Sequence, residues 1–130
     1  MKDIEKTREW LKRAKSNLAH AKVGKVFPEI LYEDLCFGAQ QAVEKALKSL
    51  CIMYGIVFER SHDISYLIGC LEAGNVEVPE AVQQSQLLTN YAVQTRYPGD
   101  YSPVNEADYK EALEIAERTV NWVEKEIHKG

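Results

Sequence analysis

The residues best equipped for chemistry lie in one short segment, "TRYPGDYSPV", at positions 95–104. The guanidinium of Arg96 suits bidentate binding of a phosphate, and the rings of Tyr97 and Tyr101 suit stacking on a nucleobase. Asp100 adds a carboxylate that could accept a proton. A purely structural alternative is that Arg96 interacts with the negative carbonyl end of the preceding helix. The residue types leave both interpretations open.

Metal, cofactor and thiol chemistry are not indicated elsewhere in the sequence. The chain has no C-x-x-C or H-E-x-x-H motif and its three histidines lack metal-ligand spacing, so we expect no metal site and no cofactor. One of them, His62, stands at the start of an expected helix, where a surface or capping role is typical; a displaced catalytic base is the alternative. The cysteines occupy apolar helical positions, which favours buried thiols: Cys36, Cys51 and Cys70.

The elements that must position these residues are predicted to be helices. Apolar residues recur at intervals of three and four, and no segment shows the alternation of a strand. Proline, glycine and capping residues mark the expected ends. The predicted helices run over about 2–23, from just after Pro28 to Gly55, from a Ser61 cap to Gly74, from near Pro79 to about 95, and from an Asn105 cap to about 128.

This pattern predicts an all-α, up-and-down bundle of four long helices plus one short helix, folded as a single domain over residues 1–130. A composition of 45% apolar and 28% charged residues is typical of a globular chain. No run of about 18 apolar residues exists that would span a membrane, and the charged N-terminus lacks the apolar core of a signal peptide. We therefore expect a cytoplasmic protein without membrane association.

Charge is distributed unevenly along the chain. Residues 1–26 carry a net charge of +5, so the remainder carries −9. We interpret the basic first helix as a neighbour of the acidic last helix, with phosphate binding as the alternative. Residues 81–95 contain no charged side chain, which favours a subunit interface or a neutral ligand-binding face. The alternative for this segment is a helix wedged between others with its glutamines pointing outward.

Three segments together resemble the HEPN family of small helical domains. They are "CFGAQQAVEKALKSL" at 36–50, "RSHDISYLI" at 60–68 and "NYAVQTRYPGDY" at 90–101. The resemblance implies a helical bundle, a homodimer, action on RNA or nucleotides, and a nucleotidyltransferase partner. It also makes Glu44 and Lys45 candidates to line the dimer cleft. Helical spacing alone predicts a simpler role, an exposed i,i+4 ion pair between Glu44 and Lys48 worth about 0.2–0.5 kcal/mol.

The resemblance is informative about catalysis as well. Many members of the family are metal-independent ribonucleases with a histidine four to six residues after an arginine; here Arg96 is present, but residues 97–103 contain no histidine. Tyr101 stands near the histidine position and could instead accept a nucleotidyl group. We interpret the chain as a nucleotide- or RNA-binding protein of a toxin–antitoxin-like pair. The alternatives are an endoribonuclease with an unconventional base, such as Asp100 or Tyr101, and a helical adaptor without a ligand.

Overall fold

The computed structural model describes residues 3–92 and 103–129, and the helices found there confirm the all-α prediction. No strand occurs among the described residues. The elements in chain order are α1 (Ile4–Val23), α2 (Tyr32–Met53), α3 (Ile64–Ala73), α4 (Glu80–Gln83), the 3-10 helix η1 (Gln84–Ala92) and α5 (Glu106–Lys129).

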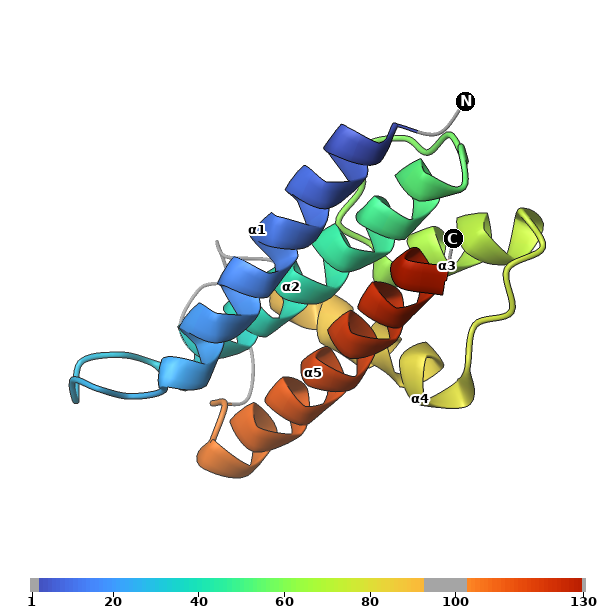
Figure 1. The fold of residues 1–130 in the computed structure, drawn as a ribbon. Helices are drawn as coiled ribbons and strands as arrows, with labels where there is room; N and C mark the ends of the chain where they lie inside the picture. Colours follow the sequence, from blue (N-terminus) through green and yellow to red (C-terminus); the bar gives the residue numbers. More distant parts are fainter. Residues whose placement is uncertain (1–2, 93–102, 130) are drawn as a thin grey trace.

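Helix α2 is the centre of the molecule, as its apolar sequence predicts. Figure 1 shows α1 running antiparallel to α2 and α5, with α3 and α4 to one side. Helices α1, α3, η1 and α5 all pack against α2. Its apolar side chains Val43, Leu47 and Leu50 are completely buried, and so are the polar residues Gln40 and Ser49. Helix α2 therefore supplies both core side chains and buried polar groups.

The predicted ends of the long helices agree closely with the structure. Helix α1 stops at Gly24, whose φ of +76° is a conformation that glycine adopts without strain. The N-terminus of α5 is capped reciprocally: Asn105 Oδ1 accepts from the Asp108 amide at 2.8 Å, and Asp108 Oδ2 accepts from the Asn105 amide at 3.1 Å. The expected Asn105 cap is thus confirmed. Helix α2 begins later than expected, at Tyr32.

Two details of the middle of the chain differ from the sequence prediction. The N-cap of α3 is Asp63, which accepts from the Ser65 amide at 2.9 Å, whereas Ser61 instead accepts from the Asp63 amide. The expected fourth helix does start after Pro79, but it changes to a 3-10 helix at Gln84. Serine, threonine and asparagine side chains in this stretch compete for backbone hydrogen bonds, which weakens an α-helix.

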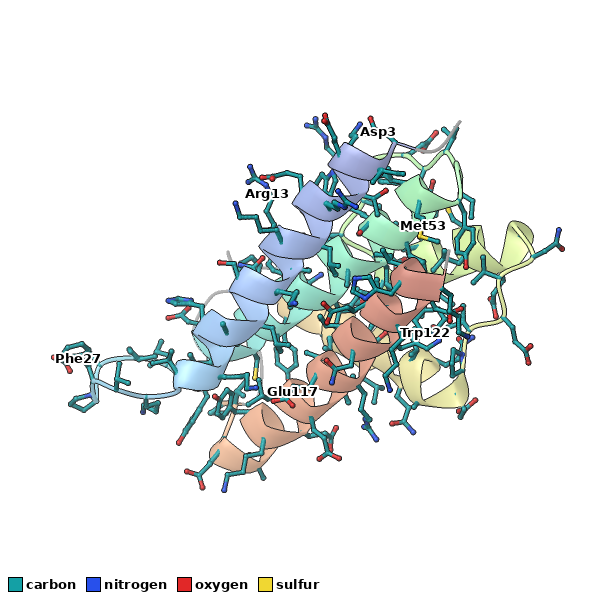
Figure 2. All side chains as sticks on the ribbon, in the orientation of Figure 1. Asp3, Arg13, Phe27, Met53, Glu117 and Trp122 are labelled. Atoms are coloured by element: carbon teal, nitrogen blue, oxygen red, sulfur yellow. The ribbon has the colours of Figure 1, made fainter. Side chains whose placement is uncertain are left out.

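The basic first helix lies beside the acidic last helix, which confirms the structural interpretation of the charge asymmetry. Figure 2 labels Glu117 on α5 and Arg13 on the neighbouring α1. Lys15 on α1 pairs with Glu124 on α5 at 2.7 Å, and Lys22 pairs with Glu117 at 3.3 Å. All four side chains keep substantial exposure, so each pair contributes at most about 1 kcal/mol. These lysines are therefore explained by the fold without a phosphate ligand.

None of the helices that the structure describes is both long enough and apolar enough to cross a membrane.

Candidate functional site

Four of the six predicted site residues, Arg96, Tyr97, Asp100 and Tyr101, fall in 93–102 and lie outside the described residues. The two elements that flank this segment are η1 before it and α5 after it. Both pack against α2. Helix α2 therefore contacts both of the elements that flank the predicted site.

The last part of η1 contains a tyrosine held against α2. Tyr91 interacts with Cys36 of α2, a residue with no exposed surface. Burial raises the pKa of Tyr91 to about 12 and that of Cys36 to about 11. Both groups are therefore protonated at neutral pH. They serve to fix η1 on α2 and are unsuited to exchanging protons with a substrate.

A polar network occupies one side of α2, and Glu44 is at its centre. Glu44 Oε1 accepts from Gln40 Nε2 at 3.2 Å and lies 2.8 Å from His62 Nδ1, while Glu44 Oε2 accepts from Lys48 Nζ at 3.0 Å. Gln40 Nε2 also donates to the His62 carbonyl at 3.3 Å. We call these four residues the Glu44 network. It joins α2 to the segment that precedes α3.

Within this network Glu44 and Lys48 are buried, which corrects their interpretation as an exposed ion pair. Their side chains retain only 4% and 7% of their surface, because α1 and the start of α3 cover this side of α2. Burial alone would raise the pKa of Glu44, but hydrogen bonds from Lys48, His62 and Gln40 outweigh it and hold the pKa below its usual 4.5. The carboxylate is thus charged and fully hydrogen-bonded.

His62 is the member of the network that faces solvent. Its side chain is 67% exposed although Nδ1 contacts the buried carboxylate of Glu44. The residue directly precedes the Asp63 cap of α3, and α3 is in turn tied to η1 by a hydrogen bond from the Ile64 amide to Thr89 Oγ1 at 3.2 Å. The sequence placed His62 at a helix start but held no sign of its contact with Glu44, since 18 residues separate the two.

Lys45 belongs to a different contact from its neighbour Glu44. Its Nζ donates to Asn17 Oδ1 of α1 at 2.7 Å, and burial lowers the pKa of Lys45. The structure therefore does not bring Glu44 and Lys45 into a common group, because adjacent residues on a helix project about 100° apart. Lys45 fastens α2 to α1, whereas Glu44 fastens α2 to the start of α3.

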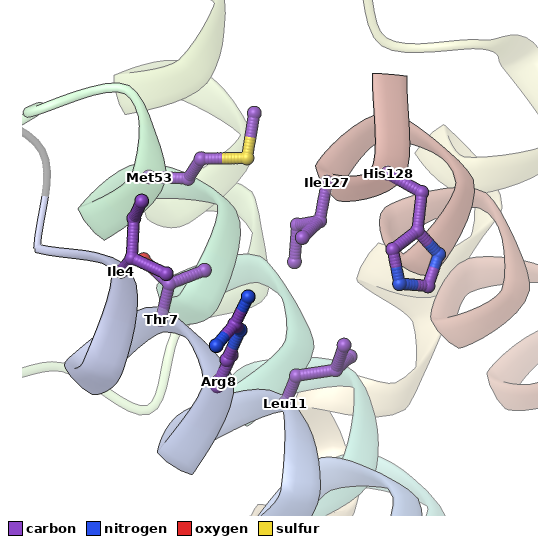
Figure 3. Close-up of a pocket in the computed structure, with 7 residues that line it drawn as sticks. All are labelled: Ile4, Thr7, Arg8, Leu11, Met53, Ile127 and His128. Carbon is purple, nitrogen blue, oxygen red and sulfur yellow. The ribbon is translucent and has the colours of Figure 1, made fainter. Parts of the chain in front are cut away.

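A separate pocket of about 290 Å³ lies at the end of the bundle where α1, α2 and α5 meet. Figure 3 shows Arg8 and His128 at this pocket, among the apolar side chains of Leu11, Met53 and Ile127. None of the predicted site residues that the structure describes lines it. No group of His, Cys, Asp and Glu suited to a metal ion occurs within residues 3–92 and 103–129.

Comparison with known proteins identifies relatives along nearly the whole chain. The model of the HEPN domain matches residues 7–126. A Methanocaldococcus jannaschii protein named "Putative toxin MJ1304" is 26% identical, and the alignment covers 94% of this chain and 86% of the relative.

Two solved structures share the fold. ST0689, described as an archaeal HEPN homologue, is 30% identical with a TM-score of 0.73, and the match covers 93% of this chain and 97% of that one. TT1696 from Thermus thermophilus is 33% identical with a TM-score of 0.78, over 92% and 96% of the two chains. The HEPN domain model matches residues 7–126, and both solved structures share the fold over more than nine-tenths of the chain. The chain therefore belongs to the HEPN domain family.

Proposed function

We propose that this HEPN protein binds RNA or a nucleotide as a homodimer, as the toxin-like half of a pair whose other half is a nucleotidyltransferase. Arg96 would hold a phosphate, with Tyr97 and Tyr101 stacking on bases and Asp100 beside them. The observation that carries the proposal is the family match over residues 7–126, a range that includes Arg96 and the whole segment after it. The name of the Methanocaldococcus jannaschii relative supports the toxin-like part.

The uncharged stretch 81–95 supports the homodimer. Its described part is η1 with the end of α4, and Leu87 there is 62% exposed although no charged side chain surrounds it in sequence. Exposed apolar side chains within charge-depleted surface are typical of the centre of a subunit interface. A second copy of the chain would cover Leu87 and bring two copies of the Arg96 segment into one assembly.

An endoribonuclease with an unconventional base is the second candidate. The specific observation that favours it is the solvent-facing imidazole of His62, anchored by a buried carboxylate, in a chain whose residues 97–103 contain no histidine. Activity of this kind would require no metal ion.

Fluorescence anisotropy with labelled single-stranded RNA and transfer RNA in the presence of a chelator tests the proposal. Arg96→Ala should weaken binding by about tenfold or more, since a charge-assisted hydrogen bond contributes about 1.5–3 kcal/mol. Arg118→Ala is the matched control, because Arg118 is exposed on α5 and lies outside the segment, and it should change affinity less than about twofold. Binding should also weaken steeply with salt.

Two results would contradict the proposal. One is a wild-type protein that retains neither RNA nor nucleotides at low salt and elutes as a monomer in light-scattering chromatography. The other is equal affinity of wild type and Arg96→Ala, which would leave the helical adaptor as the better description.

A further inference from the structure

The Glu44–His62 contact has the geometry of a carboxylate–imidazole pair. Glu44 Oε1 lies 2.8 Å from His62 Nδ1, and the carboxylate itself is held by two further donors, Gln40 Nε2 and Lys48 Nζ. A carboxylate on one ring nitrogen fixes the proton there and leaves the other nitrogen, Nε2, as an acceptor. Because the His62 side chain is 67% exposed, Nε2 is open to a ligand from solvent.

Folding stability does not explain this arrangement well. Burial of a charged pair costs desolvation energy that its mutual attraction often only offsets, so an apolar core at this position would be about as stable. Gln40 has no exposed surface, and its amide bridges the Glu44 carboxylate and the His62 backbone carbonyl. The network therefore fixes the carboxylate and the imidazole at once, which is what a positioned proton-transfer group needs.

We propose that the Glu44–His62 pair is an acid–base dyad acting on RNA, with His62 the catalytic residue and Glu44 the positioning residue. In the reaction, Nε2 of His62 takes the proton from a ribose 2′-hydroxyl. The 2′-oxygen bonds to the adjacent phosphorus while the bond from phosphorus to the 5′-oxygen breaks. The departing 5′-oxygen takes a proton from water, and the imidazolium releases its proton to solvent. The products are a 2′,3′-cyclic phosphate and a 5′-hydroxyl.

The dyad rests on the proposed binding of RNA by this protein, but it assigns the chemistry to residues outside the 93–102 segment. It also gives a reason why the chain dispenses with a histidine in residues 97–103. The imidazole would be supplied from the segment that precedes α3.

Cleavage of end-labelled RNA in a chelator tests the dyad, with the full-length protein and products resolved for a cyclic phosphate end. His62→Ala should lower the rate by about 10²–10⁴-fold, the usual contribution of a general base. Imidazole added to the buffer should restore part of the lost rate. His20→Ala is the matched control, because His20 is an exposed histidine on α1, and it should cleave like wild type.

Glu44→Gln separates positioning from mere support of the fold. It should lower kcat by at least about tenfold with little change in KM, since a neutral amide no longer fixes the proton on Nδ1. Circular dichroism spectra of both variants, recorded at the assay temperature, establish that they are folded. A rate loss in His62→Ala that imidazole does not rescue would overturn the dyad.

The failure of the dyad can be told from failure of RNA binding. Intact RNA with a wild-type protein that binds RNA tightly in the anisotropy assay would overturn the dyad and leave the binding proposal standing. Intact RNA with no binding would overturn both.

Discussion

Removing one charge of the buried Glu44–Lys48 pair should destabilise the fold far more than removing one charge of an exposed pair of the same kind. In Lys48→Met the side chain keeps its length and loses its charge, and the Glu44 carboxylate remains behind with 4% of its side-chain surface exposed. An exposed comparison exists at the same spacing: Glu106 and Lys110 are also an i,i+4 pair, at 3.4 Å, with 63% and 71% exposure. Lys110→Met is therefore the matched control.

The expected magnitude follows from distance and burial. At 3.0 Å and an effective dielectric constant of 20, the attraction between Lys48 and Glu44 is about 5–6 kcal/mol before desolvation is subtracted. Breaking a buried pair costs about 3–5 kcal/mol, because one charge stays buried without its partner. Gln40 and His62 still donate to Glu44, so we expect about 3 kcal/mol for Lys48→Met. Lys110→Met should cost about 0.5 kcal/mol or less.

Urea unfolding followed by far-UV circular dichroism measures both changes. All proteins should be compared at one concentration, because association would make the unfolding free energy depend on it. The double variant Glu44→Leu/Lys48→Met removes both charges and should recover most of the loss. The reasoning is refuted if Lys48→Met and Lys110→Met differ by less than about 1 kcal/mol at equal m-values, since burial would then have no effect on the pair.

Three further outcomes are expected. The pKa of Glu44 is lowered in the folded chain, so its charge contributes stability that is present above the unfolded pKa and is lost as pH falls through the folded pKa. The difference in melting temperature between wild type and Glu44→Gln should therefore shrink below about pH 4. Burial raises the pKa of Cys36 to about 11 and that of Cys51 to about 12, so a thiol reagent at about pH 8 should modify these two cysteines only after urea unfolds the protein. Rapid modification of either cysteine in the native chain would contradict their burial. Leu88 is 2% exposed, so Leu88→Asp should destabilise the fold by more than about 3 kcal/mol in urea. Leu87 is 62% exposed, so Leu87→Asp should convert a dimer to a monomer in light scattering and lose only the stability that association supplies.

Helix positions and helix faces were predictable because both depend on residues close in sequence. The apolar repeat of α1 predicted a buried face, and its members are buried except Ile4 at the helix start, which is 59% exposed: Ile4, Leu11, Ala14, Leu18 and Ala21. The Asn105 cap of α5 was equally local, since the hydrogen bonds that form it span three residues. The charge asymmetry also led to the right neighbour for α1, because lysines of a basic helix form ion pairs with glutamates of an acidic helix beside it.

The Glu44 network was not predictable from the spacing of residues on α2. An i,i+4 pair of Glu and Lys has the same pattern on an exposed helix and on a buried one. What distinguishes Glu44 and Lys48 from Glu106 and Lys110 is coverage by α1 and by the start of α3, which depends on tertiary packing. One signal was available: Gln40, Glu44 and Lys48 repeat every four residues, which sets three polar groups in a row along one side of the helix.

That row of polar residues is most informative when it is considered together with the segments that carry the family resemblance. Gln40, Glu44 and Lys48 lie in the "QQAVEKALK" segment, and His62 lies in "RSHDISYLI"; the structure brings both segments together through the Glu44 carboxylate. If the network served stability alone, apolar side chains of similar volume would do as well. The double variant Glu44→Leu/Lys48→Met can therefore separate the two roles. If it folds as stably as wild type but has lost its action on RNA, the network serves function. If it keeps full activity, the network serves the specificity of folding.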